Sequence, residues 1–380
     1  MNSDLHIVSF DLPYPPGYGG IIDIYYKIRF LSEAGISVHL HYFRYGRSQS
    51  EDETGRAELE KHCAAVHGYD RMTGLQSAFS PEPYIVYSRR SEELVRNLCA
   101  DRHPILFEGM HCCHYLGDPR LKGRLLIYRE SNIEHEYYRQ LASTERSFLK
   151  KIYFLIESRK LKRFQTRLAS ASRMLAVSST DCEYLRQEFP DKEVLFIPSF
   201  HRDAEVHSVP GKGDFVLYQG NLHVPENFAA AEFLIRNVWQ AGMPPLVIAG
   251  RNPDSRLLKL ASLRENIRIV PNPGDEELSE LLRTAHINLL MTFRPAGLKL
   301  KLLNALYNGR FCLVNGAMIS GTTLGPLCEL AESPEEFREK VRALFHVSFG
   351  EEEIISRSKI LKEHYSNEGN GKRLLGAIRE

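Results

Sequence analysis

A glycine and two lysines mark the start of a predicted helix in the last third of the chain. Gly297 follows an apolar run over 287–293, and Lys299 and Lys301 lie in the first turn of a helical pattern over 298–308. Glycine lets a ligand approach the backbone, and the free N–H groups at the start of a helix attract anions. Lysines are unfavourable at that end of the helix dipole, so their presence indicates an anionic partner such as a phosphate. The alternative is a helix whose lysine face is simply solvated.

The segment around these residues has the pattern of a strand–helix–strand unit. A second apolar run over 311–314 follows the helix, and Gly309 ends the helix before it. Such a unit belongs to a parallel sheet. Within the helix, Lys301, Asn304 and Asn308 are spaced three and four residues apart, so they share one face.

Two further predicted strands end in small or polar residues. The strand over 215–218 leads to Gly220 and Asn221, and the strand over 246–249 leads to Arg251. Ligand-binding groups collect at the carboxyl ends of strands in open parallel sheets. Arg251 is therefore a candidate diphosphate ligand through its planar guanidinium group, or else a solvated loop arginine.

The first half of the chain shows the same alternation of strands and helices. An apolar run over 5–10 leads through a loop rich in proline and glycine to a helix over 21–34 and a strand over 38–43. Gly19 and Gly20 precede the helix, where they would let a ligand contact the backbone or would form a plain tight turn. Further strands are predicted over 84–87, 105–107, 125–128, 174–178, 194–198 and 267–270, and further helices over 54–66, 91–99 and 333–345.

A stretch rich in histidine and cysteine, EGMHCCH over 108–114, follows one of these strands. Zinc binding is disfavoured, because adjacent ligands cannot wrap one tetrahedral ion and no second Cys/His pair follows at a usable spacing. A loop at a strand end fits better, which makes Glu108 and His111 candidates for lining a pocket.

The segment over 144–168 predicts a long basic helix. It holds eight arginines and lysines against two glutamates, with apolar residues at helical spacing. It either packs on its own domain or forms a surface that meets anionic lipid headgroups or a lipid-linked acceptor.

Length and composition set the broad class. A chain of 380 residues predicts about two domains, here 1–200 and 214–350, with terminal helices over 351–380. The net charge of +1 argues against nucleic acid as a partner. We find no apolar stretch long enough to span a membrane and no secretory signal. Seven scattered cysteines favour reduced thiols, so we expect a cytoplasmic location.

The motifs of the chain resemble those of family-4 glycosyltransferases, which have the GT-B fold. Residues 297–309 match the donor-site pattern G-x-(R/K)-x-K-x-x-E-A-(M/L)-x-x-G, except that Asn304 replaces the glutamate that holds the nucleotide ribose. Residues 129–138 match R-x-H-N-(I/V)-E-x-x-Y-Y, except that Ser131 replaces the histidine. A serine hydroxyl can hydrogen-bond a sugar but cannot accept a proton near neutral pH.

Strand–helix alternation alone predicts an α/β fold with two Rossmann-like domains, and the resemblance implies the GT-B arrangement with an interdomain cleft. It also implies transfer of a sugar, with retention, from a nucleotide-diphosphate-sugar to a glycan or lipid-linked acceptor, as in surface polysaccharide biosynthesis. The terminal helices would cross back to the first domain. No metal or other cofactor is expected, because lysines and a helix dipole supply positive charge. A location at the inner face of the cytoplasmic membrane would follow from the basic helix over 144–168.

The strand ends and the resemblance together indicate the site residues. The residues expected in catalysis are His111, Asn132 and Glu134. Those expected at the donor are Gly19, Gly20, Gly220, Asn221, Arg251, Gly297, Lys299, Lys301 and Asn304.

Two other functions fit parts of the pattern. The substitutions at Ser131 and Asn304 suit a catalytically degenerate relative that acts as a binding module or partner subunit. A Rossmann dehydrogenase is the second alternative, but no G-x-G-x-x-G follows the first strand.

Overall fold

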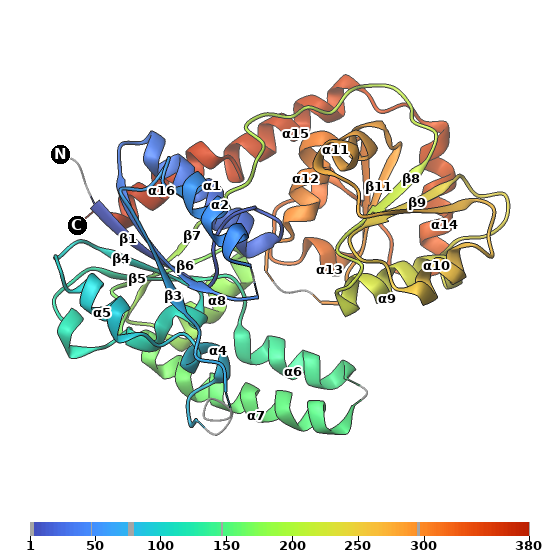
Figure 1. The fold of residues 1–380 in the computed structure, drawn as a ribbon. Coiled ribbons are helices and arrows are strands. Elements are labelled where there is room, and N and C mark those ends of the chain that lie inside the picture. Colours follow the sequence, from blue (N-terminus) through green and yellow to red (C-terminus); the bar gives the residue numbers. More distant parts are fainter. Residues whose placement is uncertain (1–3, 47, 75–79, 146, 295–296, 380) are drawn as a thin grey trace. The chain divides into compact units, whose positions relative to one another are not determined.

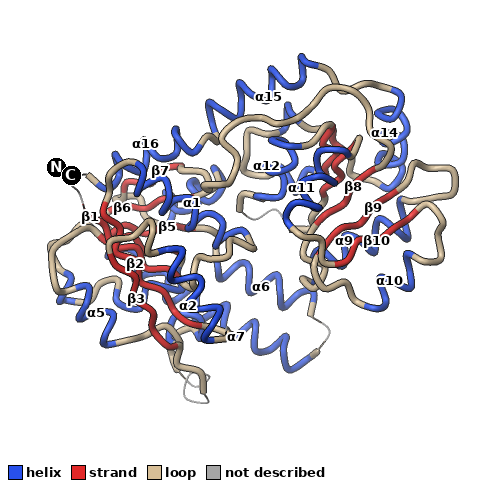
Figure 2. The backbone as a smooth tube through the Cα atoms, turned by 45° about the horizontal axis from the view of Figure 1, so that its top comes forward, coloured by secondary structure: helices blue, strands red, loops and turns tan. Residues whose placement is uncertain are grey.

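The computed structural model describes residues 4–46, 48–74, 80–145, 147–294 and 297–379. The chain forms two compact units, one made of Met1–Arg202 with Asn367–Glu380 and the other of Asp203–Ser366. Each unit has a parallel sheet flanked by helices (Figures 1 and 2). The predicted α/β class with two Rossmann-like domains is confirmed.

The N-terminal unit contains seven parallel strands in the order β3-β2-β1-β4-β5-β6-β7. The strands are β1 Asp4–Ser9, β2 Ser37–Arg44, β3 Ala65–Asp70, β4 Ile105–Glu108, β5 Leu126–Glu130, β6 Arg173–Ala176 and β7 Glu193–Phe196. The helices are α1 Gly19–Glu33, α2 Gln49–Leu59, α4 Tyr84–Tyr87, α5 Glu92–Leu98, α6 Glu134–Thr144, α7 Phe148–Phe164, α8 Ser179–Glu188 and α16 Asn367–Ile378, with short 3-10 turns at η1 Met110–Tyr115, η2 Pro119–Leu121 and η3 Gln165–Ser170.

The C-terminal unit contains six parallel strands in the order β10-β9-β8-β11-β12-β13. The strands are β8 Val216–Gln219, β9 Leu246–Gly250, β10 Ile267–Pro271, β11 Ile287–Leu290, β12 Phe311–Val314 and β13 Glu329–Leu330. The helices are α9 Pro225–Phe233, a π-helical turn η4 Leu234–Val238, α10 Ser255–Ala261, α11 Asp275–Thr284, α12 Leu300–Asn308, α13 Gly316–Ile319, a 3-10 turn η5 Gly325–Leu327, α14 Pro334–His346 and α15 Glu351–His364.

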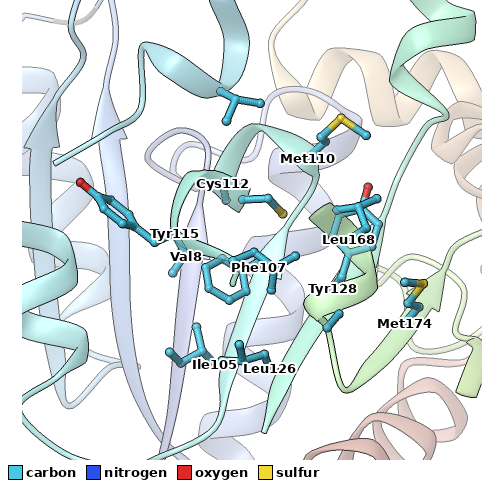
Figure 3. Packing of buried hydrophobic residues seen from close by; sticks show 14 of the residues in the cluster. Val8, Ile105, Phe107, Met110, Cys112, Tyr115, Leu126, Tyr128, Leu168 and Met174 are labelled. Carbon is cyan, nitrogen blue, oxygen red and sulfur yellow. The ribbon is translucent and has the colours of Figure 1, made fainter. Parts of the chain in front are cut away.

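The N-terminal sheet is buried on both faces, which explains the nearly continuous apolar runs of its strands. Phe107 and Tyr128 point to the face covered by α5, α7 and α8, as Figure 3 shows for part of that cluster. Leu106 and Ile127, one position earlier in each strand, point to the opposite face, beneath α1 and α16.

Strand order also places the candidate ligand sites. In each sheet the chain starts near the middle, builds outward on one side, and then continues on the other side of the first strand. The break therefore falls between β1 and β4 in one unit and between β8 and β11 in the other. Ligands of such sheets bind outside the carboxyl ends of the strands at this break.

Two local predictions were wrong. Tyr84–Tyr87 forms the helical turn α4 rather than a strand, because Pro83 precedes it and the buried Glu157 carboxylate accepts from the Tyr84 N–H at 2.6 Å. Four apolar residues cannot be assigned by periodicity alone. The helix predicted over 54–66 ends at Leu59, and Ala65 begins β3, which pairs with β2.

The basic helix predicted over 144–168 is confirmed over Phe148–Phe164, where it forms α7. It follows α6, and the two helices lie side by side in Figures 1 and 2. No helix in the described ranges is both long enough and apolar enough to cross a membrane.

Candidate functional site

Lys301 lies at the second position of α12, on the β11 side of the break in the C-terminal sheet. Its Nζ donates to Asn227 Oδ1 at 3.1 Å and lies 5.7 Å from the centre of the Tyr218 ring. Burial lowers the pKa of Lys301 to about 8, which the carboxylate of Glu226 opposes and the charge of Lys299 reinforces. A partly dehydrated ammonium group of this kind gains more from an anion than a solvated one does.

Asn227, which the sequence analysis did not single out, ties Lys301 to the loop after β8. Its Nδ2 donates to the carbonyl of Asn221 at 3.0 Å. A Cβ built on Gly220 would lie 3.1 Å from Asn227 Cγ, so the loop and the side chain are in close contact. The structure therefore brings Gly220, Asn221 and Lys301 together across the break between β8 and β11. Asn227 could have been identified from the sequence, because it is a polar residue in the first turn of a helix that follows a strand-end loop.

A second contact joins α9 to the end of β11. The hydroxyl of Thr292 donates to the carboxylate of Glu226, and Thr292 itself is buried. The backbone N–H of Thr292 also donates to Oδ1 of Asn315, which follows β12, at 3.1 Å. The strand ends around Lys301 are thus fixed to one another by side-chain hydrogen bonds.

Asn304 is half-buried on the same helix as Lys301. Its Oδ1 accepts from Asn308 Nδ2 at 2.9 Å, which uses one of the two lone pairs of that oxygen. Its Nδ2 group and the remaining lone pair of Oδ1 can contact a hydroxyl.

The other expected donor residues surround the start of α12 and the neighbouring strand end. Gly297 has φ = 61°, a conformation that favours glycine. Lys299 is the N-cap residue of α12. Arg251 follows β9 with an exposed side chain, and its carbonyl accepts from Leu222 N–H at 3.0 Å. Residues 295 and 296 of the preceding loop lie outside the described residues.

In the N-terminal unit, two candidate catalytic residues lie close together. His111, in the turn after β4, has its Nδ1 3.9 Å from Oε1 of Glu134, the first residue of α6 after β5. Burial raises the pKa of Glu134 to about 8, with the nearby Arg89 opposing it. Burial lowers the pKa of His111 well below its usual value. At neutral pH the pair is therefore a protonated carboxyl beside a neutral imidazole, an arrangement that can donate and accept a proton.

Asn132 is held by the buried carboxyl group of Glu130. Its backbone N–H donates to Glu130 Oε1 at 3.2 Å, and the side chain of Glu130 also accepts from the Tyr128 hydroxyl at 2.7 Å. Burial raises the pKa of Glu130 well above its usual value. The loop that carries Ser131 and Asn132 is thus anchored by Glu130, which sequence reasoning missed.

Gly20 and Gly19 differ in what surrounds them. A Cβ on Gly20 would lie 2.8 Å from the ring of Phe10, whereas none of the described atoms lies within 4 Å of one on Gly19. Phe10 contacts His111 with ring centres 5.3 Å apart, and its carbonyl accepts from Arg89 Nε at 2.9 Å. Gly20 therefore allows Phe10 to lie against His111, while Gly19 leaves the backbone open.

Glu108, expected to line a pocket, is instead buried in an ion network beneath these residues. Lys27 Nζ contacts Glu108 Oε1 at 2.6 Å and Asp23 Oδ2 at 3.2 Å. Arg129 Nε contacts Asp23 Oδ2 at 3.0 Å. This network connects α1 to the ends of β4 and β5 and so positions the segments that carry His111 and Glu134. The spacing of Asp23 and Lys27 by four residues on one helix was its only local signal.

The stretch rich in histidine and cysteine does not form a metal centre. Cys112 and Cys113 are buried, and His114 Nδ1 is 2.9 Å from Glu82 Oε2. Within the described ranges, no group of three or more His, Cys, Asp or Glu side chains is arranged to hold a metal ion.

Two pockets lie elsewhere in the N-terminal unit. One of about 570 Å³ is lined by charged residues that include Arg44 and Asp52, and one of about 560 Å³ by residues that include Glu82 and Arg120. Their facing charges are paired with one another, as in the contact of Arg44 with Asp52 at 3.2 Å. Neither contains a residue of the candidate site.

Comparison with known proteins bears on this arrangement. No protein-family model matches the chain. An uncharacterized 44.6 kDa protein in the cps region of Klebsiella pneumoniae is 27% identical over 340 residues, covering 83% of this chain and 84% of that protein.

Solved structures resemble the whole chain. A mutant of S. aureus TarM in complex with fondaparinux, alpha-GlcNAc-glycerol and UDP has a TM-score of 0.66 at 9% identity, covering 100% of each chain. Anabaena HepE in complex with UDP and glucose has a TM-score of 0.64 at 11% identity, covering 99% of each chain. A glycosyltransferase from Rickettsia africae has a TM-score of 0.58 at 12% identity, covering 99% of this chain and 97% of that one. The fold of this chain is therefore that of GT-B glycosyltransferases.

Proposed function

We propose that this chain is a glycosyltransferase that moves a sugar from a nucleotide-diphosphate-sugar to a glycan or lipid-linked acceptor, with retention of configuration. The observation that carries the proposal is the position of Lys301. It is a partly buried cation at the start of a helix, beside the loop after β8, at the break in a doubly wound sheet. Structures of similar fold contain UDP with a sugar or a glycoside, which supports the same donor class here.

The donor half of the reaction follows from charge. When the bond to the sugar breaks, negative charge develops on the departing diphosphate and must be stabilised. Lys301 and the N-terminus of α12 would meet that charge, with Lys299 and Arg251 as further cations. Gly297 and Gly220 would let the phosphates approach the backbone.

The acceptor half is assigned to the N-terminal unit. A protonated Glu134 beside a neutral His111 can hydrogen-bond sugar hydroxyls and exchange a proton with them. Asn132, whose backbone N–H donates to Glu130, would orient the same hydroxyls.

A catalytically degenerate binding protein or partner subunit is the second candidate, and one observation favours it. At the ribose-binding position Asn304 offers a neutral amide whose Oδ1 already accepts from Asn308, in place of a carboxylate with charge-assisted hydrogen bonds. Together with Ser131, this would leave a site that binds a nucleotide sugar without turning it over.

The first test is a thermal-shift screen of the purified chain against UDP, GDP, ADP and their common sugars. A ligand that binds only the folded state raises the melting temperature by mass action. We expect one nucleotide to act selectively and Lys301→Ala to lose at least about tenfold in affinity for it, since a charge-assisted hydrogen bond contributes about 1.5–3 kcal/mol. Lys259→Ala is the matched control, because Lys259 is exposed on α10 away from the site.

Three results are decisive. Unchanged affinity in Lys301→Ala removes Lys301 from the site. A selective shift without sugar transfer or donor hydrolysis supports the degenerate alternative. No shift with any nucleotide at millimolar concentration contradicts the donor site in both forms of the proposal.

A further inference from the structure

The outer face of α7 carries a continuous stripe of exposed apolar side chains. Phe148 and Leu149 are 73% and 78% exposed, and Ile152, Tyr153 and Ile156 are each at least 39% exposed. The other four residues follow Phe148 by one, four, five and eight positions, so all five lie on one side of the helix. The opposite side, with Leu161 and Phe164, is buried against the N-terminal unit.

Basic side chains border this stripe. Lys150 and Lys151 lie on its two flanks, and Arg159 and Arg163 continue the same side of the helix toward its C-terminal end. All four are exposed, and none forms an ion pair with an acidic group among the described residues.

The outer face carries no compensating acid. The only acidic residue between Phe148 and Phe164 is Glu157, whose side chain is buried. It accepts from the Tyr84 N–H at 2.6 Å and from Lys160 Nζ at 2.9 Å, so its charge is used inside the unit. The face therefore presents apolar groups and uncompensated positive charge together.

We propose that this face of α7 docks on the surface of an anionic lipid bilayer. Apolar side chains of an interfacial helix enter the boundary between headgroups and acyl chains, while flanking lysines and arginines contact anionic headgroups. Docking would hold the chain beside a lipid-linked acceptor. The link to a lipid-linked acceptor rests on the proposed function. The contact with lipid does not, because it can be measured without any sugar transfer.

A second copy of the chain fits this face less well. Pairing two copies through the same face would bring Lys150, Lys151, Arg159 and Arg163 of each copy together, and like charges at a contact oppose association. A bilayer rich in phosphatidylglycerol supplies the complementary charge and an apolar interior.

The test is flotation of the full-length protein with vesicles of phosphatidylcholine that contain 0 or 30% phosphatidylglycerol. We expect binding to the anionic vesicles, weaker binding in 0.5 M NaCl because salt screens the charges, and little binding to neutral vesicles. The double variant Lys150→Gln/Lys151→Gln should reduce the partition coefficient about 25-fold, on the order of fivefold for each charge near the surface. Leu149→Ser should reduce it about tenfold through lost apolar burial.

Matched variants control for exposure and charge. Leu263→Ser removes a leucine that is 75% exposed on the C-terminal unit, and Lys259→Gln/Lys359→Gln removes two exposed lysines of that unit. Both should bind vesicles like the unmodified protein. Each variant's melting temperature confirms that it folds, and Phe148→Ser replaces Leu149→Ser if the latter does not.

The proposal is overturned if the unmodified protein fails to float with anionic vesicles, or if the α7 variants and their controls lose binding equally. A dimer in solution that Leu149→Ser dissociates would assign the face to a second copy. If the protein binds anionic vesicles but binds no nucleotide, the proposed function fails while the membrane-docking proposal stands.

Discussion

Asn304 illustrates how one side chain can separate donor binding from turnover. Its Oδ1 already accepts from Asn308 Nδ2, so the residue can offer a ribose hydroxyl its N–H groups and one remaining lone pair. A carboxylate has two acceptor oxygens and forms charge-assisted hydrogen bonds that are about twice as strong as neutral ones.

We expect Asn304→Glu to tighten binding of the preferred nucleotide about fivefold to tenfold, as one stronger hydrogen bond would. Isothermal titration calorimetry with the unmodified protein and with Asn304→Ala as the reference would measure this. Weaker or unchanged binding in Asn304→Glu would mean that residue 304 does not contact the ribose.

Glu134 predicts a pH dependence with a definite sign. Its pKa rises from 4.5 to about 8 on folding because the carboxyl is buried. Between these values the folded state holds a proton that the unfolded state has released, so the free energy of unfolding falls as pH rises through this window and is constant above it.

Glu134→Gln removes this titration while keeping the shape of the side chain. The melting temperature of the variant relative to the unmodified protein should therefore rise from pH 5 to pH 8, by an amount that corresponds to at most about 1.4 kcal/mol for each pH unit. Glu352→Gln, at an exposed position of α15, should show no such trend. A flat difference for Glu134→Gln would mean that Glu134 is ionised in the folded protein at neutral pH.

At the scale of elements, the loop after β8 depends on a glycine in the neighbouring strand. A Cβ on Gly250, the last residue of β9, would lie 1.9 Å from the carbonyl oxygen of Gly220 and 2.9 Å from Leu222 Cγ. The backbone of the loop that meets Asn227 and Lys301 can take its place only because residue 250 has no side chain.

Gly250→Ala should displace this loop, lowering stability by about 1–3 kcal/mol as overpacking does and weakening nucleotide binding as well. Thermal melting and nucleotide titration would measure the two effects. Gly376→Ala is the control, since none of the described atoms lies within 4 Å of its Cβ and its position within α16 suits alanine. Equal melting temperatures for the two variants would contradict the close approach.

The helix that carries Lys301 is also held at its other end. Arg357 of α15 is buried, and its Nη1 donates to the carbonyl of Gly309 at 2.6 Å and to that of Leu306 at 3.4 Å. A cation at this end of α12 complements the helix dipole. The local pattern of α12 was predictable from sequence, whereas this support from a distant helix was not.

Some elements were predictable from local sequence patterns and others were not. Strands β11 and β12 and the helix between them were predicted because their apolar runs are bounded by turn signals. Strand β3 was missed, since only pairing with β2 stabilises its mixed sequence. The candidate site residues were predicted from strand ends and from the family resemblance. Asn227 was missed although its place in the first turn of α9 was a local signal, whereas Arg89 was missed because its contact with the Phe10 carbonyl is one that no local pattern encodes.

At the scale of the molecule, the last helix completes the first unit. Helix α16 packs against α1 (Figure 2), and Leu374 is fully buried in the cluster that contains Ile24 and Ile28. Asn367 at its start bonds to both backbone groups of His201, its Oδ1 accepting at 3.1 Å and its Nδ2 donating at 2.6 Å. The family resemblance led us to expect terminal helices that return to the first domain, but no local sequence pattern indicates that α16 covers α1.

Two glycines of α16 provide a matched pair for testing this contact. A Cβ on Gly371 would lie 2.0 Å from the ring of Phe30 in α1, whereas none of the described atoms lies within 4 Å of one on Gly376. Gly371→Ala should therefore destabilise the N-terminal unit by about 1–3 kcal/mol. Gly376→Ala should be neutral or slightly stabilising, because alanine favours a helix. Chemical denaturation of both variants would measure the difference, and a Gly371→Ala variant as stable as Gly376→Ala would rule out the close packing of α16 on α1.

The return of the chain to its first unit has a consequence during synthesis. A ribosome makes residues 203–366 after most of the N-terminal unit has emerged and before α16 exists. The apolar surface of α1 that α16 covers must therefore stay open while the whole C-terminal unit is translated, and such exposed surface favours aggregation. A nascent chain stalled before residue 367 would hold the first unit without its closing helix, which makes that interval the one in which a chaperone would be needed.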